Sequence, residues 1–164
     1  IFYPITNSYG VYLCIGGGYQ SWSAIFQANE RLYANANKKK VILYFGDLDP
    51  SGKDMPRDIL SRLSMLGSDV EVIDVALRME DVSEYSLPRN PAKKTDSRSR
   101  WYVDKYGIDY AVELDALPPK ILEDRINEAI HYFCDIDLLK EKQYGDIVEK
   151  RLWEKWVESI STAR

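Results

Sequence analysis

Histidine and cysteine are scarce in this chain, which has one histidine, His131, and two cysteines, Cys14 and Cys134, among 164 residues. A single histidine argues against a histidine-rich zinc site and against a catalytic triad built on histidine. Both cysteines stand in apolar stretches of the sequence. We therefore expect reduced thiols in the core of a cytoplasmic protein rather than a disulfide.

Long apolar runs and an excess of positive charge are also lacking. No stretch approaches the roughly 18 consecutive apolar residues of a membrane span, and no signal peptide opens the chain, so we expect no membrane partner. The net charge of −4 argues against a uniformly basic protein that coats DNA, but it allows a local basic patch. The chain begins at Ile1 without Met, and we expect a domain of a larger protein.

Apolar runs alternate with amphipathic stretches along most of the chain, whose composition of 45% hydrophobic and 29% charged residues suits a globular core. The runs at 10–16, 39–46, 70–77 and 110–116 predict strands, and apolar spacing predicts helices over 20–37, 51–66 and 117–133. Short helices are expected near 78–85 and before Gly107, separated by an extended loop. This alternation predicts an α/β fold, a compact and mainly parallel sheet with helices on both faces.

The tail from residue 135 is helical in character. Trp153 and Trp156 share one of its faces, and we expect that face to serve as core or as a contact between subunits.

Two aspartates, Asp47 and Asp49, end the apolar run at 41–46 and stand directly before Pro-Ser-Gly. In a parallel sheet this is the edge where ligands bind. Two neighbouring negative charges repel each other unless a cation lies between them, and Mg²⁺ is commonly held by one or two carboxylates. The pattern predicts a Mg²⁺ or Mn²⁺ site at Asp47 and Asp49. The alternative is that Asp47 caps a turn and Asp49 caps the following helix.

The stretch ILYFGDLDPSGKDM resembles the Asp-x-Asp motif of the TOPRIM domain, the metal-binding module of topoisomerases, bacterial-type primases and several nucleases. Its Asp-Pro-Ser-Gly ending is most similar to the version in type IIB topoisomerase A subunits. The stretches GGGYQSWSAIFQANE, LPRNPAKKTDSR and VELDALPP resemble TOPRIM-like proteins of phages and bacteria. The resemblance implies a TOPRIM-like α/β domain over 1–134 and a helical extension over 135–164. It also carries the family's metal-binding pair over onto Asp47 and Asp49.

One part of the family pattern is missing. TOPRIM domains usually have a glutamate at the end of the first strand, as general acid/base or metal ligand, whereas residues 15–19 read Ile-Gly-Gly-Gly-Tyr. Glu113 and Asp115 end another predicted strand and would point to the same side of it. We expect one or both to complete the carboxylate cluster as catalytic residues. Alternatively, Asp115 caps the next helix and Glu113 pairs with a lysine.

A basic stretch lies between the third and fourth predicted strands. Residues 86–105 hold six basic and two acidic residues, a net charge of +4, so the rest of the chain carries −8. Trp101 and Tyr102 belong to the same stretch, and cations beside aromatic rings suit a phosphate backbone and a stacked base. The side chains expected to contact nucleic acid are Arg89, Lys93, Lys94, Arg98 and Arg100. The alternative is a solvated loop.

Together these features predict a Mg²⁺-dependent TOPRIM-type domain that acts on nucleic acid phosphodiesters by cleavage, nicking or strand transfer, with DNA as the expected partner. Further domains, or a second copy joined through the C-terminal helix, are additional expected partners. Two alternatives stay open. One is a non-catalytic nucleic-acid-binding or interaction module with a degenerate TOPRIM site. The other is a phosphatase of the haloacid-dehalogenase type, whose Asp-x-Asp motif also follows an apolar strand.

Overall fold

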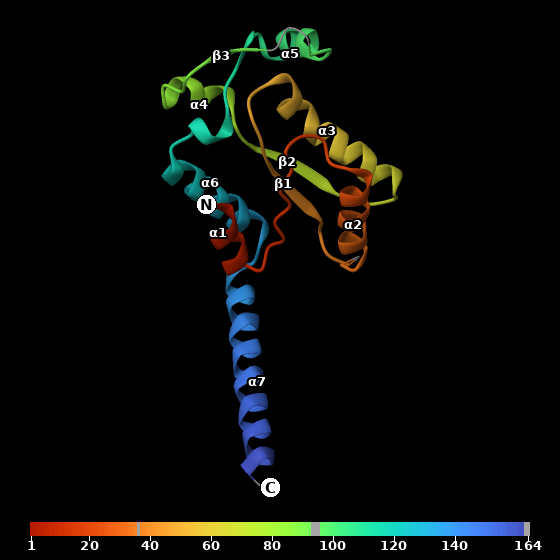
Figure 1. The fold of residues 1–164 in the computed structure, drawn as a ribbon, viewed down its shortest axis with the longest axis vertical. Helices are drawn as coiled ribbons and strands as arrows, with labels where there is room; N and C mark the ends of the chain where they lie inside the picture. The colour runs from red at the N-terminus through yellow and green to blue at the C-terminus, as the bar shows by residue number, and fades with distance from the viewer. Residues whose placement is uncertain (36, 93–95, 163–164) are drawn as a thin grey trace.

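A long helix, α7 (Ile136–Thr162), projects from a body in which helices surround a small sheet (Figure 1). The structure is a computed structural model that describes residues 1–35, 37–92 and 96–162, the last five of them by backbone only. Along the chain, α1 (Phe2–Ser8) and α2 (Trp22–Tyr33) precede the first strand. The α/β class predicted from the sequence is confirmed.

The centre of the body is a parallel strand pair with a helical crossover. β1 (Val41–Phe45) runs beside β2 (Glu71–Ala76), with Val41 opposite Glu71, and α3 (Pro50–Met65) connects them. Both strands and this helix were expected from the apolar runs and their spacing.

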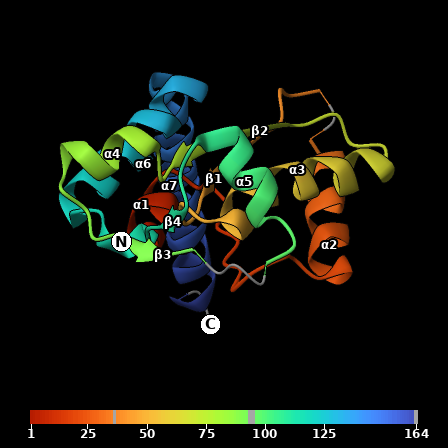
Figure 2. The same cartoon turned by 90° about the horizontal axis from the view of Figure 1, so that it is seen from above.

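β1 is covered on both faces because its side chains alternate between two apolar clusters. Ile42 packs against the cluster under α2 and α3, whose buried members are Ile25, Leu63 and Val70. Leu43 and Phe45 pack against the larger cluster on the other face, which α6 (Pro119–Phe133) helps to build. Two views agree that α2 and α3 lie on one side of the strand pair and α1 and α6 on the other (Figures 1 and 2). The buried residues of the larger cluster are Leu48, Leu77, Val82, Leu87, Val112, Leu117, Leu122, Ile126 and Ile130.

The parallel sheet is smaller than predicted, because two of the four expected strands do not join it. Residues 11–16 form no strand, and Tyr12 and Ile15 are 63% and 84% exposed. The glycines at positions 16–18 weaken strand formation at the end of this run. The exposed side chains of Tyr12 and Ile15 show that part of the run does not pack against the core. Within the described residues, the parallel sheet has two strands.

The expected strand at 110–116 is also different. The strand here is limited to β4 (Tyr110–Ala111), which pairs antiparallel with β3 (Asn90–Pro91) in a separate ribbon. The chain then turns into the short 3₁₀ helix η1 (Leu114–Ala116). Proline at the end of β3 has no N–H to donate, which limits how far this ribbon can extend. The short helices expected around this ribbon are present as α4 (Met79–Glu84) and α5 (Ser99–Tyr106).

The two cysteines occupy different environments. Both thiols are free, as expected, but Cys14 is exposed and Cys134 is half-buried. The prediction of a core position for Cys14 is wrong, because its segment is not a strand of the sheet. Cys134 does pack against the larger apolar cluster.

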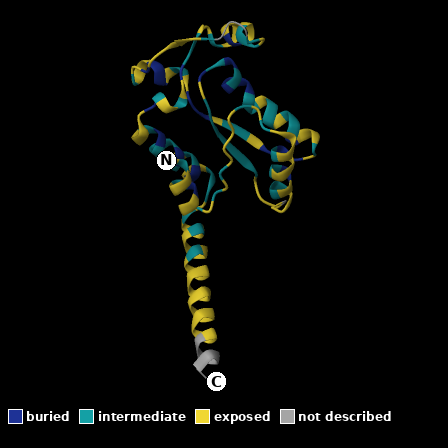
Figure 3. Ribbon diagram, viewed as in Figure 1, coloured by how far each residue is buried: buried dark blue, intermediate teal, exposed yellow. Residues whose placement is uncertain are grey.

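From its first turns to Val157, α7 is almost entirely exposed (Figure 3). Trp153 and Trp156 meet edge to face at 5.1 Å between ring centroids and are 62% and 56% exposed. These rings are therefore not part of this chain's core, and a contact between subunits stays a prediction. None of the helices in the described part of the chain combines the length and apolar composition needed to cross a membrane.

Replacing Gly52 by alanine is expected to lower the free energy of unfolding by about 1–3 kcal/mol or more, as overpacking does. Gly52 is buried in the first turn of α3, and an added Cβ would collide with the Asp47 carbonyl oxygen. The Tm from thermal unfolding measures the effect. Gly145→Ala is the matched control, since a Cβ at this helical position meets nothing within 4 Å. Equal Tm values for the two variants would contradict the expectation.

Candidate functional site

The candidate site begins where β1 ends and the chain turns toward α3. Gly46 continues the parallel pairing by one step, since Gly46 N donates to the Ala76 carbonyl at 2.7 Å and Leu77 N donates back at 2.8 Å. Leu48 then forms an isolated antiparallel bridge with Val112. The two bridge hydrogen bonds, each from a backbone N–H to the opposite carbonyl, measure 2.9 and 3.0 Å. Both bridged side chains are fully buried.

The two aspartates of the motif differ in their surroundings. Asp49 is half-buried and caps α3, with Oδ1 accepting from Gly52 N at 2.6 Å. Asp47 is exposed, and its Oδ1 accepts from Leu114 N at 2.8 Å. The capping role considered for Asp49 is thus present. Within the described residues, neither Oδ2 atom has a hydrogen bond, so each carboxylate keeps one oxygen available to a cation.

Glu113 and Asp115 follow the bridge on the opposite segment, and both side chains are exposed. With Asp47 they line one pocket of about 670 Å³. Asp49 is not among its lining residues, which also include Phe2, Ile15, Gly16, Leu114 and Leu122. The structure therefore brings three of the four predicted carboxylates to the same pocket.

Neither alternative considered for these two acids is seen among the described residues. α6 begins after Pro118 without a side-chain cap, so Asp115 does not cap it. Glu113 forms no ion pair with a lysine among the described residues. Within this same part of the chain, no three His, Cys, Asp or Glu side chains form a group that could hold a metal ion. A complete carboxylate cluster therefore stays a prediction.

The segment in which the resembling family has its glutamate borders the same pocket. Ile15 and Gly16 contribute to the lining, although their segment is not a strand. No acidic side chain comes from this side. The negative charge in the pocket thus derives from Asp47 and from the residues after Val112.

Negative charge also gathers around Tyr44, at the end of β1. Burial raises the pKa of Tyr44, and the nearby charges of Asp74, Asp47 and Asp49 raise it further, so the phenol stays neutral. The compensating cation is Lys53, which is 8% exposed and pairs with Asp74 at 2.6 Å. Sequence analysis missed Lys53, although a lysine in the first turn of a helix after two aspartates is an available signal.

Tyr102 anchors α5 to this region. It is fully buried, and its hydroxyl lies 3.1 Å from both the Leu48 and the Tyr110 carbonyl oxygens. Leu48 is the residue between the two aspartates. Tyr102 therefore stabilises the packing of α5. Of these two adjacent rings, Trp101 is the one that is exposed and could stack with a base.

The predicted nucleic-acid contacts are distributed unequally. The Arg100 side chain is 94% exposed, and Arg89 is also exposed, with its guanidinium 4.7 Å from the Tyr110 ring centroid. Arg98 is half-buried and already paired, with its Nε donating to Asp96 Oδ1 at 2.7 Å. Lys93 and Lys94 lie outside the described residues.

Arg98 belongs to a polar network that sequence analysis did not find. It also donates to the Tyr19 hydroxyl, which in turn donates to Asp54 at 2.6 Å. Ser51 Oγ donates to Asp96 at 3.0 Å. Burial, followed by the Asp54 contact, raises the pKa of Tyr19 to about 12. The network therefore connects Tyr19, which follows the three glycines, and residues 96–98 of the basic stretch to the first turns of α3.

No protein-family model, curated protein or solved structure matches this chain at a significant level. The TOPRIM resemblance therefore stays a resemblance.

Asp96→Asn is expected to lower the free energy of unfolding by about 1.5–3 kcal/mol at neutral pH, the range for hydrogen bonds to charged groups. Hydrogen bonds from Arg98 lower the pKa of Asp96 to about 2 in the folded protein. Because this pKa lies below its unfolded value near 3.9, the stabilisation is complete above about pH 4 and is lost as the pH falls toward 2. The Tm difference from the parent should shrink across that window.

Asp104→Asn is the matched control for this pH profile. Asp104 is 72% exposed and lies 4.0 Å from Arg100, so its loss should change the Tm little at any pH. A Tm difference between Asp96→Asn and the parent that stays constant down to pH 2 would contradict the assignment.

Proposed function

We propose that this chain is a Mg²⁺-dependent TOPRIM-type domain that acts on nucleic acid phosphodiesters. The observation that carries the proposal is the shared pocket of Asp47, Glu113 and Asp115 at the carboxyl end of β1. This edge of a parallel strand pair is where α/β proteins bind ligands. The resemblance of the surrounding motif to the TOPRIM Asp-x-Asp motif supports the same reading.

The donor set suits magnesium. All four acids offer carboxylate oxygens, the hard ligands that Mg²⁺ prefers, and the described residues of the pocket lining bring no nitrogen or sulfur side chain. Asp47 and Asp49 would hold the ion through the oxygens not used in backbone hydrogen bonds. A bound Mg²⁺ supplies charge stabilisation to a scissile phosphate and its leaving oxygen.

The protein's own groups would orient the two metal-binding carboxylates and accept a proton. The Leu114 N–H keeps the Asp47 carboxylate in one orientation, and the Gly52 N–H does the same for Asp49. Glu113 and Asp115 are exposed at the pocket, so either can accept a proton from an attacking water. Hydrolysis of this kind needs no tyrosine nucleophile.

A non-catalytic nucleic-acid-binding module is the second candidate. The observations in its favour are that Asp49 is used as a helix cap and that the segment at 15–16 brings no acid to the pocket. Such a module would bind DNA without cleaving it.

Asp47→Asn and Asp49→Asn are expected to weaken Mn²⁺ binding by more than the roughly 10- to 100-fold that losing an outer-shell partner costs. Isothermal titration calorimetry measures this affinity. In parallel, nicking of supercoiled plasmid by the parent should need Mg²⁺ and should be lost in both variants. Asp69→Asn, at an exposed aspartate before β2, removes the same charge and is the matched control.

Each outcome separates the candidates. Unchanged Mn²⁺ affinity in both variants would refute the proposed metal site. DNA binding by the parent without Mg²⁺-dependent nicking would favour the binding module. Phosphate release from a small ester without nicking would favour the phosphatase alternative.

A further inference from the structure

α5 presents two faces of opposite chemistry. Its inner face carries Tyr102, which is fully buried and bonded to the Leu48 carbonyl. Its outer face carries Arg100, Trp101 and Lys105, all exposed. The helix is therefore held firmly from within and leaves a cationic and aromatic surface outside.

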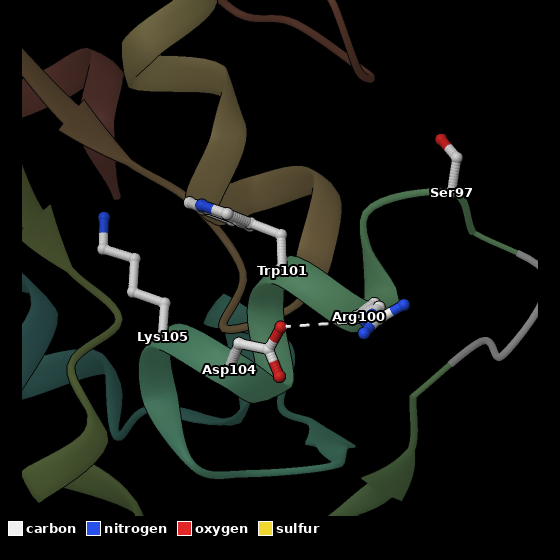
Figure 4. Close-up of a pocket in the computed structure, with 5 residues that line it drawn as sticks. All are labelled: Ser97, Arg100, Trp101, Asp104 and Lys105. Carbon is white, nitrogen blue, oxygen red and sulfur yellow. Dashed lines mark ion pairs between the residues drawn. The ribbon is translucent and has the colours of Figure 1, made fainter.

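The outer face holds a shallow, open depression. Ser97, Arg100, Trp101, Asp104 and Lys105 line a depression of about 530 Å³ (Figure 4). The Trp101 ring meets Tyr106 edge to face at 5.9 Å between centroids, and Lys105 Nζ lies 5.0 Å from the Trp101 ring centroid. These contacts restrain the indole, and it remains 36% exposed.

The cations around this ring are open to an external anion. Arg100 pairs with Asp104 only at 4.0 Å, with 94% and 72% of the two side chains exposed. An ion pair this open contributes little to stability, so a phosphate can compete for the guanidinium. Arg98, in contrast, is already bound to Asp96 and Tyr19.

A restrained, exposed indole flanked by an arginine and a lysine has the chemistry that single-stranded nucleic acid requires. Base–aromatic stacking needs an unpaired base, since the faces of the bases in a duplex are already stacked. An acidic peptide would use the two cations but would leave the ring without a role. The chain carries −4 overall, so no diffuse positive field accounts for such binding.

We propose that the outer face of α5 binds single-stranded nucleic acid, with a base stacked on Trp101 and the backbone phosphates bound by Arg100 and Lys105. This inference rests on the proposed action on nucleic acid phosphodiesters and adds the strand type and the contact residues. Tyr102 hydrogen-bonds the carbonyl between Asp47 and Asp49, so the strand is held at a defined position relative to the proposed metal site.

The test measures binding of a fluorescent single-stranded oligothymidylate in EDTA at several salt concentrations, with a duplex of equal length beside it. Trp101→Ala should weaken single-strand binding about 5- to 150-fold, the range for loss of one base–aromatic stack, without changing the salt slope. Arg100→Gln should instead shallow the slope of log K against log salt by about 0.7, since one phosphate contact is lost.

Two control variants match these changes. Trp153→Ala removes a tryptophan that is 62% exposed on α7, and Lys150→Gln removes an exposed positive charge from the same helix. Neither should alter binding. Trp101→Phe keeps a smaller ring and should show an intermediate loss of affinity. If circular dichroism shows that Trp101→Ala does not fold, Trp101→Phe replaces it in the test.

Parent-like single-strand affinity in Trp101→Ala, or no single-strand binding by the parent, would overturn the inference. Equal weakening of duplex binding would overturn the single-strand assignment, and polyglutamate bound as tightly as the oligonucleotide would indicate an acidic peptide instead. Because EDTA removes divalent cations, these results do not depend on the metal site. Failure of Mg²⁺-dependent nicking would leave them unchanged.

Discussion

The antiparallel bridge between Leu48 and Val112 is the constraint on which the site depends. Its two backbone hydrogen bonds lie in a region where both side chains are fully buried, so water cannot replace them. Leu48 also accepts the Tyr102 hydroxyl, which means that a single peptide carbonyl receives two donors. One residue thereby connects the end of β1, the segment leading to η1, and α5.

The position of this bridge sets the chemistry around it. Leu48 separates Asp47 from Asp49, and the two carboxylates have different surroundings, one in the pocket and one in the α3 cap, where the chain turns into the helix. The residues after Val112 come beside Asp47 because the bridge fixes their register. Other negative charges near this region are balanced within the protein: Asp74 pairs with Lys53 of α3, and Asp96 pairs with Arg98 and accepts from Ser51 of α3.

Local pattern predicted the parts of the fold that depend on one element and its nearest neighbours. The apolar run at 41–45 and the helical spacing at 51–66 are confirmed as β1 and α3, because a strand buried on both faces leaves a continuous apolar run and an amphipathic helix leaves a helical periodicity. The runs at 10–16 and 110–116 have similar composition but lack a neighbouring strand along most of their length. Strand formation depends on that neighbour, which no local window contains.

The amino-acid sequence alone was enough to predict the β1–α3–β2 unit, the turn at Asp47 and Asp49 that leads into α3, and the cluster of basic residues near α5. Which members of each group are exposed and unpaired enough to bind a partner depends on the tertiary structure. Trp101 and Tyr102 are adjacent in sequence, yet one is exposed and the other fully buried, because a helix turns successive residues by about 100°. Arg98 and Arg100 differ for a similar reason, since Arg98 meets the Tyr19 hydroxyl, an acceptor from a distant segment, in addition to Asp96. Burial and pairing depend on contacts between distant segments, and a linear pattern of charges and rings does not encode them.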